Sequence, residues 1–523
     1  MGFMNSLKKT LNKEFNTSVT ENGAVGYRTT GKNLLDLNFA VTSLRNTGEE
    51  DIIDKFVKAF YEDRRLAVIW LFFASDVREG LGERRLFRVC FQYLAANHPD
   101  IAGAVLELVP EYSRWDNLLC GLDTGLRSSV AALVKRQLEE DIKNMEEEKP
   151  ISLCAKWLPS VNASSQETRR LARMLAEDLG MTERRYRKTL AHLRRYLKVV
   201  EVSMSAGEWA DIDYKAVPSR ANLVYNRAFL RNDEERRRAF LGALKKGETT
   251  IHAGVLYPHD IVHSYFETGV QRWNPDLKPE DDTLEALWAA LPDYVGGAGN
   301  TLCVSDGSGS MTSTVGATGV SCLDVANALS IYFSEHCSGQ FRDKYITFSA
   351  NPQFVDFGKA GTLREKLEIA RHYNEVANTN IEAVFDLILQ TARAERMSQE
   401  ELPATVLILS DMEFDAAARC NNYMPGGNSS LGLPTEALFD TLAKRYGAAG
   451  YRLPRLVFWN ICSRTGTVPV RENQLGVALV SGFSVTIMKM VLSGETDPYK
   501  CLLEQLETER YKAVDEALKS IEE

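Results

Sequence analysis

Three side chains that carry oxygen stand at alternate positions in the segment CVSDGSGSM, namely Asp306, Ser308 and Ser310. Glycines separate them, so no bulky side chain crowds the space between the oxygens. Alternate spacing in a tight turn lets the two hydroxyls face the same side. Carboxylates and hydroxyls are hard donors, which suit magnesium, manganese or calcium better than zinc. Taken alone, the segment also fits a flexible turn or the loop of a nucleophile.

A second acid stands in an equivalent position later in the chain. Asp306 follows the apolar run TLCVS, and Asp411 follows the apolar run ATVLILS. Ligands of parallel sheets bind beyond the carboxyl ends of the strands, so neighbouring strands would direct both carboxylates into one crevice. Thr379, at the start of a predicted helix, could add another oxygen. We expect the nearby Glu413 and Asp415 to be solvated loop residues, although they could instead hold water around a metal.

This D-x-S-x-S motif, with the later threonine and aspartate and the order of strands and helices, resembles the von Willebrand factor A domain family. The resemblance implies that Asp306, Ser308, Ser310, Thr379 and Asp411 form that family's metal-ion-dependent adhesion site. It implies a divalent cation, magnesium first, with manganese or calcium as alternatives. It also implies an open coordination position that accepts water or an acidic group of a partner protein.

Enzymatic readings of the same loop fit less well. DGSGSM is not a G-x-S-x-G elbow, because Asp306 occupies the place of the first glycine. His336 and His372 fall in predicted helices rather than in strand-end loops. The sequence contains no G-x-x-x-x-G-K-[ST] phosphate-binding loop. We therefore expect no enzymatic activity, with a metal-dependent hydrolase as an alternative.

The sequence pattern predicts a multidomain chain. Residues 30–295 consist of amphipathic helical segments with short connections, typical of an all-α helical-repeat domain of the HEAT-like kind. Residues 296–523 alternate apolar strand-like runs with helical segments, which predicts a doubly wound α/β domain with a parallel sheet. Residues 1–29 are expected to be a polar N-terminal leader.

Composition is that of a soluble globular protein. The 523 residues are 44% hydrophobic and 25% charged, and the net charge of −9 argues against a wholly basic nucleic-acid coat. Nine scattered cysteines form no CxxC pair, which indicates buried reduced thiols and a cytoplasmic protein. No apolar stretch reaches transmembrane length, so no membrane partner is expected.

One part of the acidic chain is locally basic. Residues 161–250 contain 19 Lys and Arg against 12 Asp and Glu, a surplus that could form a positive face for RNA. Tyr186 and Tyr196 interleave with the cations and could stack on unpaired bases, although core tyrosines are the common alternative. The candidate RNA-binding residues are Arg184, Arg185, Arg187, Lys188, Arg194 and Arg195.

Four motifs of the helical part resemble the TROVE proteins, the family of the Ro autoantigens: SDVREGLGERRLFR, VPEYSRWDNLL, SLCAKWLPSVNASS and AGEWADIDYKAVPSRA. The last two motifs are more similar to an uncharacterised TROVE-related family of bacterial, phage and plant proteins. The resemblance to that family spans roughly residues 20–515. The Ro resemblance implies a helical part that closes into a ring, as a monomer or small assembly, and binds small noncoding or misfolded RNA. The alternative is a metal-dependent protein-interaction module without RNA binding.

These motifs also allow structural roles. Arg114, Trp115 and Asp116 could cap a helix and pack its base, and Lys156 with Trp157 could form a cation–π contact. At this point RNA contact and a structural role are equally good interpretations of each motif.

Overall fold

The computed structural model describes residues 16–22, 25–266, 276–296, 300–316, 319–348, 352–374, 380–414, 438–469, 476–484, 487–492, 495 and 497–522. The chain forms two compact units. An α/β unit comprises residues 1–48, 256–281 and 291–505, and a helical unit comprises residues 49–255, 282–290 and 506–523. This differs from the expected linear division at 295/296. Residues 1–48 and 256–281 belong to the α/β unit, and residues 506–523 belong to the helical unit.

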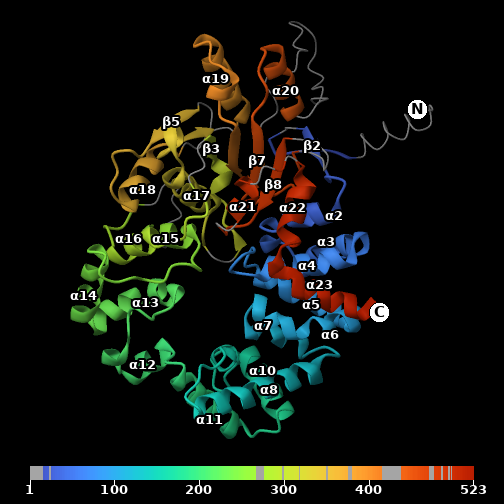
Figure 1. Cartoon of the computed structure of the whole chain (residues 1–523), viewed down its shortest axis with the longest axis vertical. Coiled ribbons are helices and arrows are strands. Elements are labelled where there is room, and N and C mark those ends of the chain that lie inside the picture. Colours follow the sequence, from blue (N-terminus) through green and yellow to red (C-terminus); the bar gives the residue numbers. More distant parts are fainter. Residues whose placement is uncertain are drawn as a thin grey trace. The chain divides into compact units, whose positions relative to one another are not determined.

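The helical unit confirms the all-α prediction for this half of the chain (Figure 1). At the start of some of its helices a polar side chain satisfies a free amide; Ser165, for example, accepts a hydrogen bond from the amide of Thr168 at the start of α10. The helices are α3 (Glu49–Glu62), α4 (Arg64–Ser75), α5 (Arg84–Asn97), α6 (Pro99–Ala104), α7 (Val109–Tyr112), α8 (Arg127–Glu146), α9 (Cys154–Trp157), α10 (Gln166–Asp178), α11 (Glu183–Tyr196), α12 (Val200–Ala206), α13 (Ser219–Asn232), α14 (Glu234–Lys245), α16 (Asp282–Ala289) and α23 (Lys512–Glu522).

The ion pair between Asp76 and Arg510 helps to join the last residues to the helical unit. Asp76, 1% exposed, accepts a hydrogen bond of 2.9 Å from Nε of Arg510, just before α23. The Arg510 guanidinium also lies 4.7 Å from the ring centre of Tyr112. Tyr112 in turn donates its hydroxyl to the carbonyl of Arg510 at 2.7 Å. These contacts fix the last helix against α4 and α7.

The α/β unit contains a six-stranded sheet of order β5-β4-β3-β6-β7-β8, parallel except for the β4–β5 pair. Since the chain proceeds from β3 outward to β4 and later returns to β6 on the other side, strand order reverses between β3 and β6. The strands are β3 (Thr301–Asp306), β4 (Lys344–Phe348), β5 (Gln353–Asp356), β6 (Thr405–Ser410), β7 (Arg455–Asn460) and β8 (Val477–Ser481).

Burial along the central strands shows that both faces of the sheet are covered. Every residue of β3 and β8 is buried, and so are five of the six in β6 and β7, although successive side chains point to opposite faces. This confirms the predicted fold class, a doubly wound α/β domain. The helices of the unit are α2 (Asn33–Phe39), α15 (Pro258–Tyr265), α17 (Cys322–His336), α18 (Leu363–His372), α19 (Ile381–Ala394), α20 (Leu438–Ala448), α21 (Met488–Leu492) and α22 (Pro498–Leu506).

Part of the segment expected to be a polar leader forms regular structure. Within it, β1 (Thr17–Val19) and β2 (Val25–Tyr27) form an antiparallel pair, and Tyr27 bridges to Val468 beyond β7. The strands are short, and the residue that Tyr27 bridges to lies more than 400 positions away, so the local sequence does not predict this pairing. This hairpin is therefore an integral part of the α/β unit.

Two expectations from composition concern the described residues. Eight cysteines there are free and buried, as expected for reduced thiols, and Cys420 lies outside the described residues. None of the described helices is both long and apolar enough to cross a bilayer.

Replacing Arg510 by methionine should lower the free energy of unfolding of the helical unit by about 3 kcal/mol, because the Asp76 carboxylate would stay buried without its counter-charge. Urea unfolding followed by circular dichroism measures this loss. Lys512→Met is the matched control, since its pair with Glu509 is exposed and contributes below about 1 kcal/mol. Equal midpoints for the two variants would contradict the assigned role of the Asp76–Arg510 pair.

Candidate cation site and basic helix

The two strand-end acids lie on neighbouring strands, as the sequence predicts. Strands β3 and β6 pair in parallel, with Ser305 opposite Leu409, so Asp306 and the residue before Asp411 come next in the register. Met412 then turns the chain with a φ of 65°, an uncommon conformation for a residue with a side chain. The two carboxylates therefore share the edge of the sheet at which the strand order reverses.

The loop after β3 is held by hydrogen bonds around Asp306. Its Oδ1 accepts from the amide of Ser308 at 2.9 Å, and its Oδ2 accepts from the hydroxyl of Ser410 at 2.6 Å. The hydroxyl oxygens of Ser308 and Ser310 lie 2.9 Å apart, which confirms that they face the same side. Ser410 was missed by sequence reasoning, although its place one residue before Asp411 on the neighbouring strand is a usable signal.

Burial makes this pair of carboxylates electrostatically costly. Asp306 is 0% exposed and Asp411 is 1% exposed. Burial raises the pKa of Asp306 most, and the negative charge of Asp411 raises it further. Burial also raises the pKa of Asp411, while the Ser310 hydroxyl and the Glu413 amide oppose that rise. Two adjacent buried acids in the charged form need a compensating positive charge.

The donor set fits a hard divalent cation. Asp411 Oδ2 is buried and accepts no hydrogen bond from a described residue, and the nearest guanidinium nitrogen, Nη2 of Arg464, is 3.6 Å away. Such an orphaned carboxylate oxygen, beside a second carboxylate and two hydroxyls, matches the preference of magnesium for oxygen ligands. No cluster of three or more His, Cys, Asp or Glu occurs among the described residues, so the set depends on hydroxyls. Thr379 lies outside the described residues.

The expectation for Glu413 is wrong, and Asp415 lies outside the described residues. Glu413 is 0% exposed rather than solvated. Its Oε1 accepts hydrogen bonds from the amides of Arg464 and Thr465, both at 2.9 Å, and from the hydroxyl of Ser463 at 3.2 Å. Its Oε2 accepts from the amide of Glu21 at 2.9 Å. Through these hydrogen bonds Glu413 joins the loop after β7 to the N-terminal segment.

The candidate RNA-binding cations of helix α11 differ in their exposure to solvent. The side chains of Arg184, Arg185, Arg187, Lys188 and Arg195 are exposed, and none forms an ion pair with another described residue. Arg194 is half-buried and donates to the carbonyls of Ala155 and Leu158 and to the hydroxyl of Ser160. Burial lowers the pKa of Arg194. Its guanidinium therefore anchors the α9 segment.

The tyrosines of α11 belong to the interior. Tyr186 is 0% exposed and donates its hydroxyl to the carbonyl of Pro159 at 2.9 Å, so it cannot stack on a base. Tyr196 is half-buried and donates to the carbonyl of Lys149 at 2.9 Å. Helical spacing brings one side chain in three or four to the core, and at 186 that side chain is a tyrosine.

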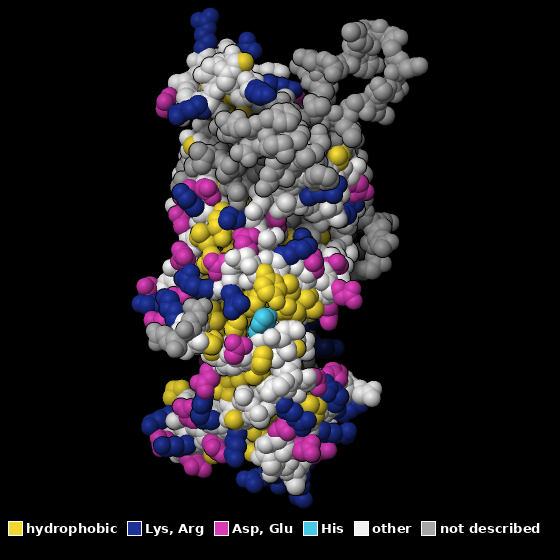
Figure 2. Space-filling model, turned by 90° about the vertical axis from the view of Figure 1, so that its right-hand side faces the viewer, with side chains coloured by type: hydrophobic (Ala, Val, Ile, Leu, Met, Phe, Trp, Pro, Cys, Tyr) yellow, Lys and Arg dark blue, Asp and Glu magenta, His cyan; other side chains and the backbone are white. Residues whose placement is uncertain are grey.

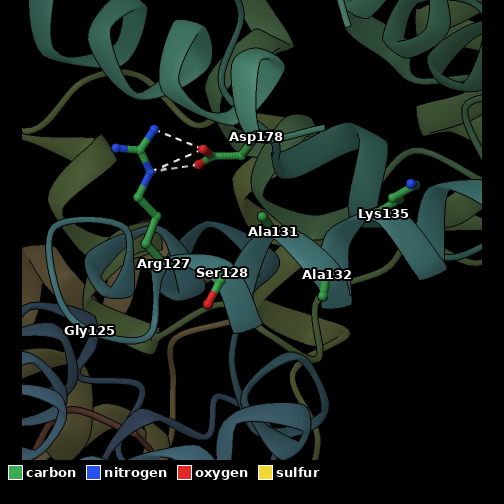
Figure 3. A pocket seen from close by; sticks show the side chains of 7 residues that line it. All are labelled: Gly125, Arg127, Ser128, Ala131, Ala132, Lys135 and Asp178. Atoms are coloured by element: carbon green, nitrogen blue, oxygen red, sulfur yellow. Dashed lines mark hydrogen bonds and ion pairs between the residues drawn. The ribbon is translucent and has the colours of Figure 1, made fainter. Parts of the chain in front are cut away.

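A surface pocket of about 490 Å³ lies between α8 and α10, the neighbours of α11. Arg127 Nη2 pairs with Asp178 at 2.8 Å, so these two charges compensate each other (Figure 3). Figure 3 shows Lys135 pointing away from that pair, and it forms no ion pair with a described residue. The remaining lining residues are Gly125, Ser128, Ala131 and Ala132.

The polar motifs of the helical half make internal contacts. Arg114 forms an ion pair with Asp116 and lies 3.9 Å from the ring centre of Trp157. The expected cation–π contact is present, since the Lys156 ammonium lies 5.3 Å from the same ring. Trp115 is 8% exposed. The structural interpretation of these residues therefore accounts for their contacts.

Two family matches cover the chain. Residues 20–112 and 124–300, more than half of the chain, match the family described as Domain of unknown function (DUF2828). The chain belongs to the DUF2828 family. Residues 300–521 match a second family, Domain of unknown function (DUF7788). Membership of DUF2828 agrees with the expected relation to a family without established biochemistry.

Two individual proteins are similar to this DUF2828 chain. "Uncharacterized protein L728" of Acanthamoeba polyphaga mimivirus is 29% identical over 532 residues, which cover 94% of this chain and 87% of that protein. The crystal structure of the Deinococcus radiodurans RO (RSR) protein matches with a TM-score of 0.40 and 16% identity, over 91% of this chain and 93% of that one. At that similarity, the RO structure supports no inference about the function of the DUF2828 chain.

Without divalent cations, the free energy of unfolding of the DUF2828 α/β unit should fall as pH rises from about 4 to about 7. The pKa of Asp306 is raised from 3.8 to about 7, so the folded state holds a proton that the unfolded state has released. Chemical denaturation in EDTA across this range, compared with Asp306→Asn, isolates the effect. A difference between the two proteins that does not change with pH would contradict the assigned electrostatics.

Proposed function

We propose that this DUF2828 protein is a binding protein, not an enzyme, whose α/β unit holds a divalent cation as an anchor for a partner. The observation that carries the proposal is the buried Asp306–Asp411 pair with an orphaned oxygen on Asp411. Removing two carboxylates from water without a counter-charge costs several kcal/mol for each ion. A divalent cation beside both acids offsets this cost.

Each residue of the site has a distinct task in this proposal. Asp306 and Asp411 supply negative charge, and Ser308 and Ser310 supply neutral oxygens that face the same side. Thr379 completes the set expected from the von Willebrand factor A resemblance. Magnesium is the first choice, with manganese or calcium as alternatives. When bound, the cation offers a coordination position to an oxygen of a partner, and the buried surroundings exclude competing water.

RNA binding by the helical unit is the second proposed function. Its support is the group of five exposed α11 cations that form no ion pair with another described residue, together with the TROVE-like motifs. The lower part of Figure 2, where α8, α10 and α11 lie in Figure 1, shows Lys and Arg side chains interspersed with acidic ones. Such cations would neutralise RNA phosphates and release counterions, so binding would weaken steeply with salt. A helical part that acts only in protein contacts would lack this salt dependence.

Magnesium should stabilise the wild-type chain by RT ln(1 + [Mg²⁺]/Kd), about 2.7 kcal/mol at a hundredfold excess over Kd. Asp411→Asn should abolish this gain. At pH 8 in EDTA the same variant should melt at a higher temperature than wild type, because the repulsion with Asp306 is gone. Thermal unfolding with and without magnesium measures both effects.

The control for that experiment is Glu395→Gln, which removes an exposed carboxylate of the same unit. It should respond to magnesium as wild type does. A magnesium gain that survives Asp411→Asn would remove the residue from the ligand set, and with it the proposal.

Charge reversal of Arg184, Arg185 and Arg187 to glutamate should weaken RNA binding at least tenfold, or about 1.4 kcal/mol, and flatten its salt dependence. These side chains are exposed, so the fold should persist. Filter binding to structured and single-stranded RNA at two salt concentrations measures both quantities. As a control, charge reversal of Arg64 on α4 and Arg85 on α5 tests whether any basic residues of the helical unit contribute equally to RNA affinity. An unchanged affinity in the α11 variant would contradict the assignment.

A further inference from the structure

One arginine stands at the exposed side of the candidate cation site. Asp306, Ser308 and Asp411 are buried, whereas the side chain of Arg464 is 38% exposed. Its Nη2 lies 3.6 Å from Asp411 Oδ2, the same oxygen that accepts no hydrogen bond from a described residue. Among the described residues of this region, the guanidinium is therefore the group with positive charge that both solvent and a site carboxylate can reach.

Hydrogen bonds to Glu413 fix the backbone of Arg464. The Glu413 carboxylate accepts a hydrogen bond from the Arg464 amide at 2.9 Å, and from the amide and hydroxyl of Thr465 at 2.9 and 3.0 Å. The hydroxyl of Ser463 accepts from the amide of Gly466 at 3.0 Å, which closes the turn. Because the loop is held in this way, little backbone conformational entropy is lost when the guanidinium binds an anion.

The chain itself supplies a carboxylate to this guanidinium. Oε2 of Glu21, from the turn between β1 and β2, lies 2.7 Å from Nη2 of Arg464, and the Glu21 side chain is 54% exposed. The turn is tied down next to the site, since Thr20 donates to the carbonyl of Phe414 and Asn22 donates to the carbonyl of Glu413. An exposed ion pair contributes little stability. Its position matters more, because it shows that a carboxylate fits against Arg464 at the edge of the site.

We propose that Arg464 recognises an acidic side chain of a partner protein at the mouth of the cation site, and that Glu21 occupies this place until the partner displaces it. The inference rests on the proposed cation site and names the chemistry of its partner. A carboxylate placed here meets two positive groups, the cation and the guanidinium, and two donors of the guanidinium fork can engage it. Arg464 thus selects an anion over water, and Glu21 sets the threshold for binding.

The experiment uses the full chain and a fluorescein-labelled oligoglutamate peptide, with fluorescence anisotropy in saturating magnesium and in EDTA. Arg464→Gln should weaken peptide binding about tenfold, the effect of losing a charge-assisted hydrogen-bond pair. Glu21→Gln should strengthen it severalfold, because the internal competitor is neutralised while its backbone contact with Glu413 remains. Both variants should keep the thermal stabilisation by magnesium, which reports the cation site independently.

Arg452→Gln is the matched control, since Arg452 is an exposed arginine of the same unit that precedes β7, at the opposite end of that strand. It should leave peptide affinity unchanged. Wild-type affinity in both Arg464→Gln and Glu21→Gln, with the magnesium response intact, would overturn this inference alone. A wild-type chain without any magnesium response would instead remove the cation site on which it rests. If Arg464→Gln released a labelled oligoribonucleotide but not the peptide, the acidic protein partner would be wrong.

Discussion

The α/β unit depends on the charge of two carboxylates that its topology forces together. Parallel pairing of β3 and β6 places Asp306 and Asp411 at one edge, and burial withdraws both from water. Hydrogen bonds from Ser308 and Ser410 offset part of the cost for Asp306. No described residue donates a hydrogen bond to Asp411 Oδ2. Such a pair at the topological switch point is the basis of our proposal that an external positive charge completes the site.

Glu413 provides the contrast within the same few residues. It is as deeply buried as Asp411, yet amides and hydroxyls from two chain segments surround it. A carboxylate that the protein satisfies by itself has a structural role, and here that role is to join the N-terminal hairpin to the loop after β7. A carboxylate left partly unsatisfied invites a ligand. The difference in donors, rather than in burial, distinguishes the structural role of Glu413 from the cation-binding role that we propose for Asp411.

Sequence reasoning reached what local pattern and strand order determine. The apolar runs before Asp306 and Asp411 predicted β3 and β6, and the D-x-S-x-S spacing predicted the shared direction of the two hydroxyls. It missed features that only long-range contacts create: the β1–β2 hairpin, the burial of Glu413 and the approach of Arg464. Tyr186 failed as a base-stacking residue for the same reason, because charge clustering does not reveal which side of α11 is buried.

In both units, buried polar groups form hydrogen bonds with partners from distant segments of the chain.

The most direct test of the central claim, that a cation binds at Asp306 and Asp411, is an anomalous difference map from crystals grown with manganese. The account predicts a peak enclosed by the carboxylates of Asp306 and Asp411 and the hydroxyls of Ser308 and Ser310. A well-ordered structure of that edge with no peak there, or with a peak elsewhere on the chain, would contradict it.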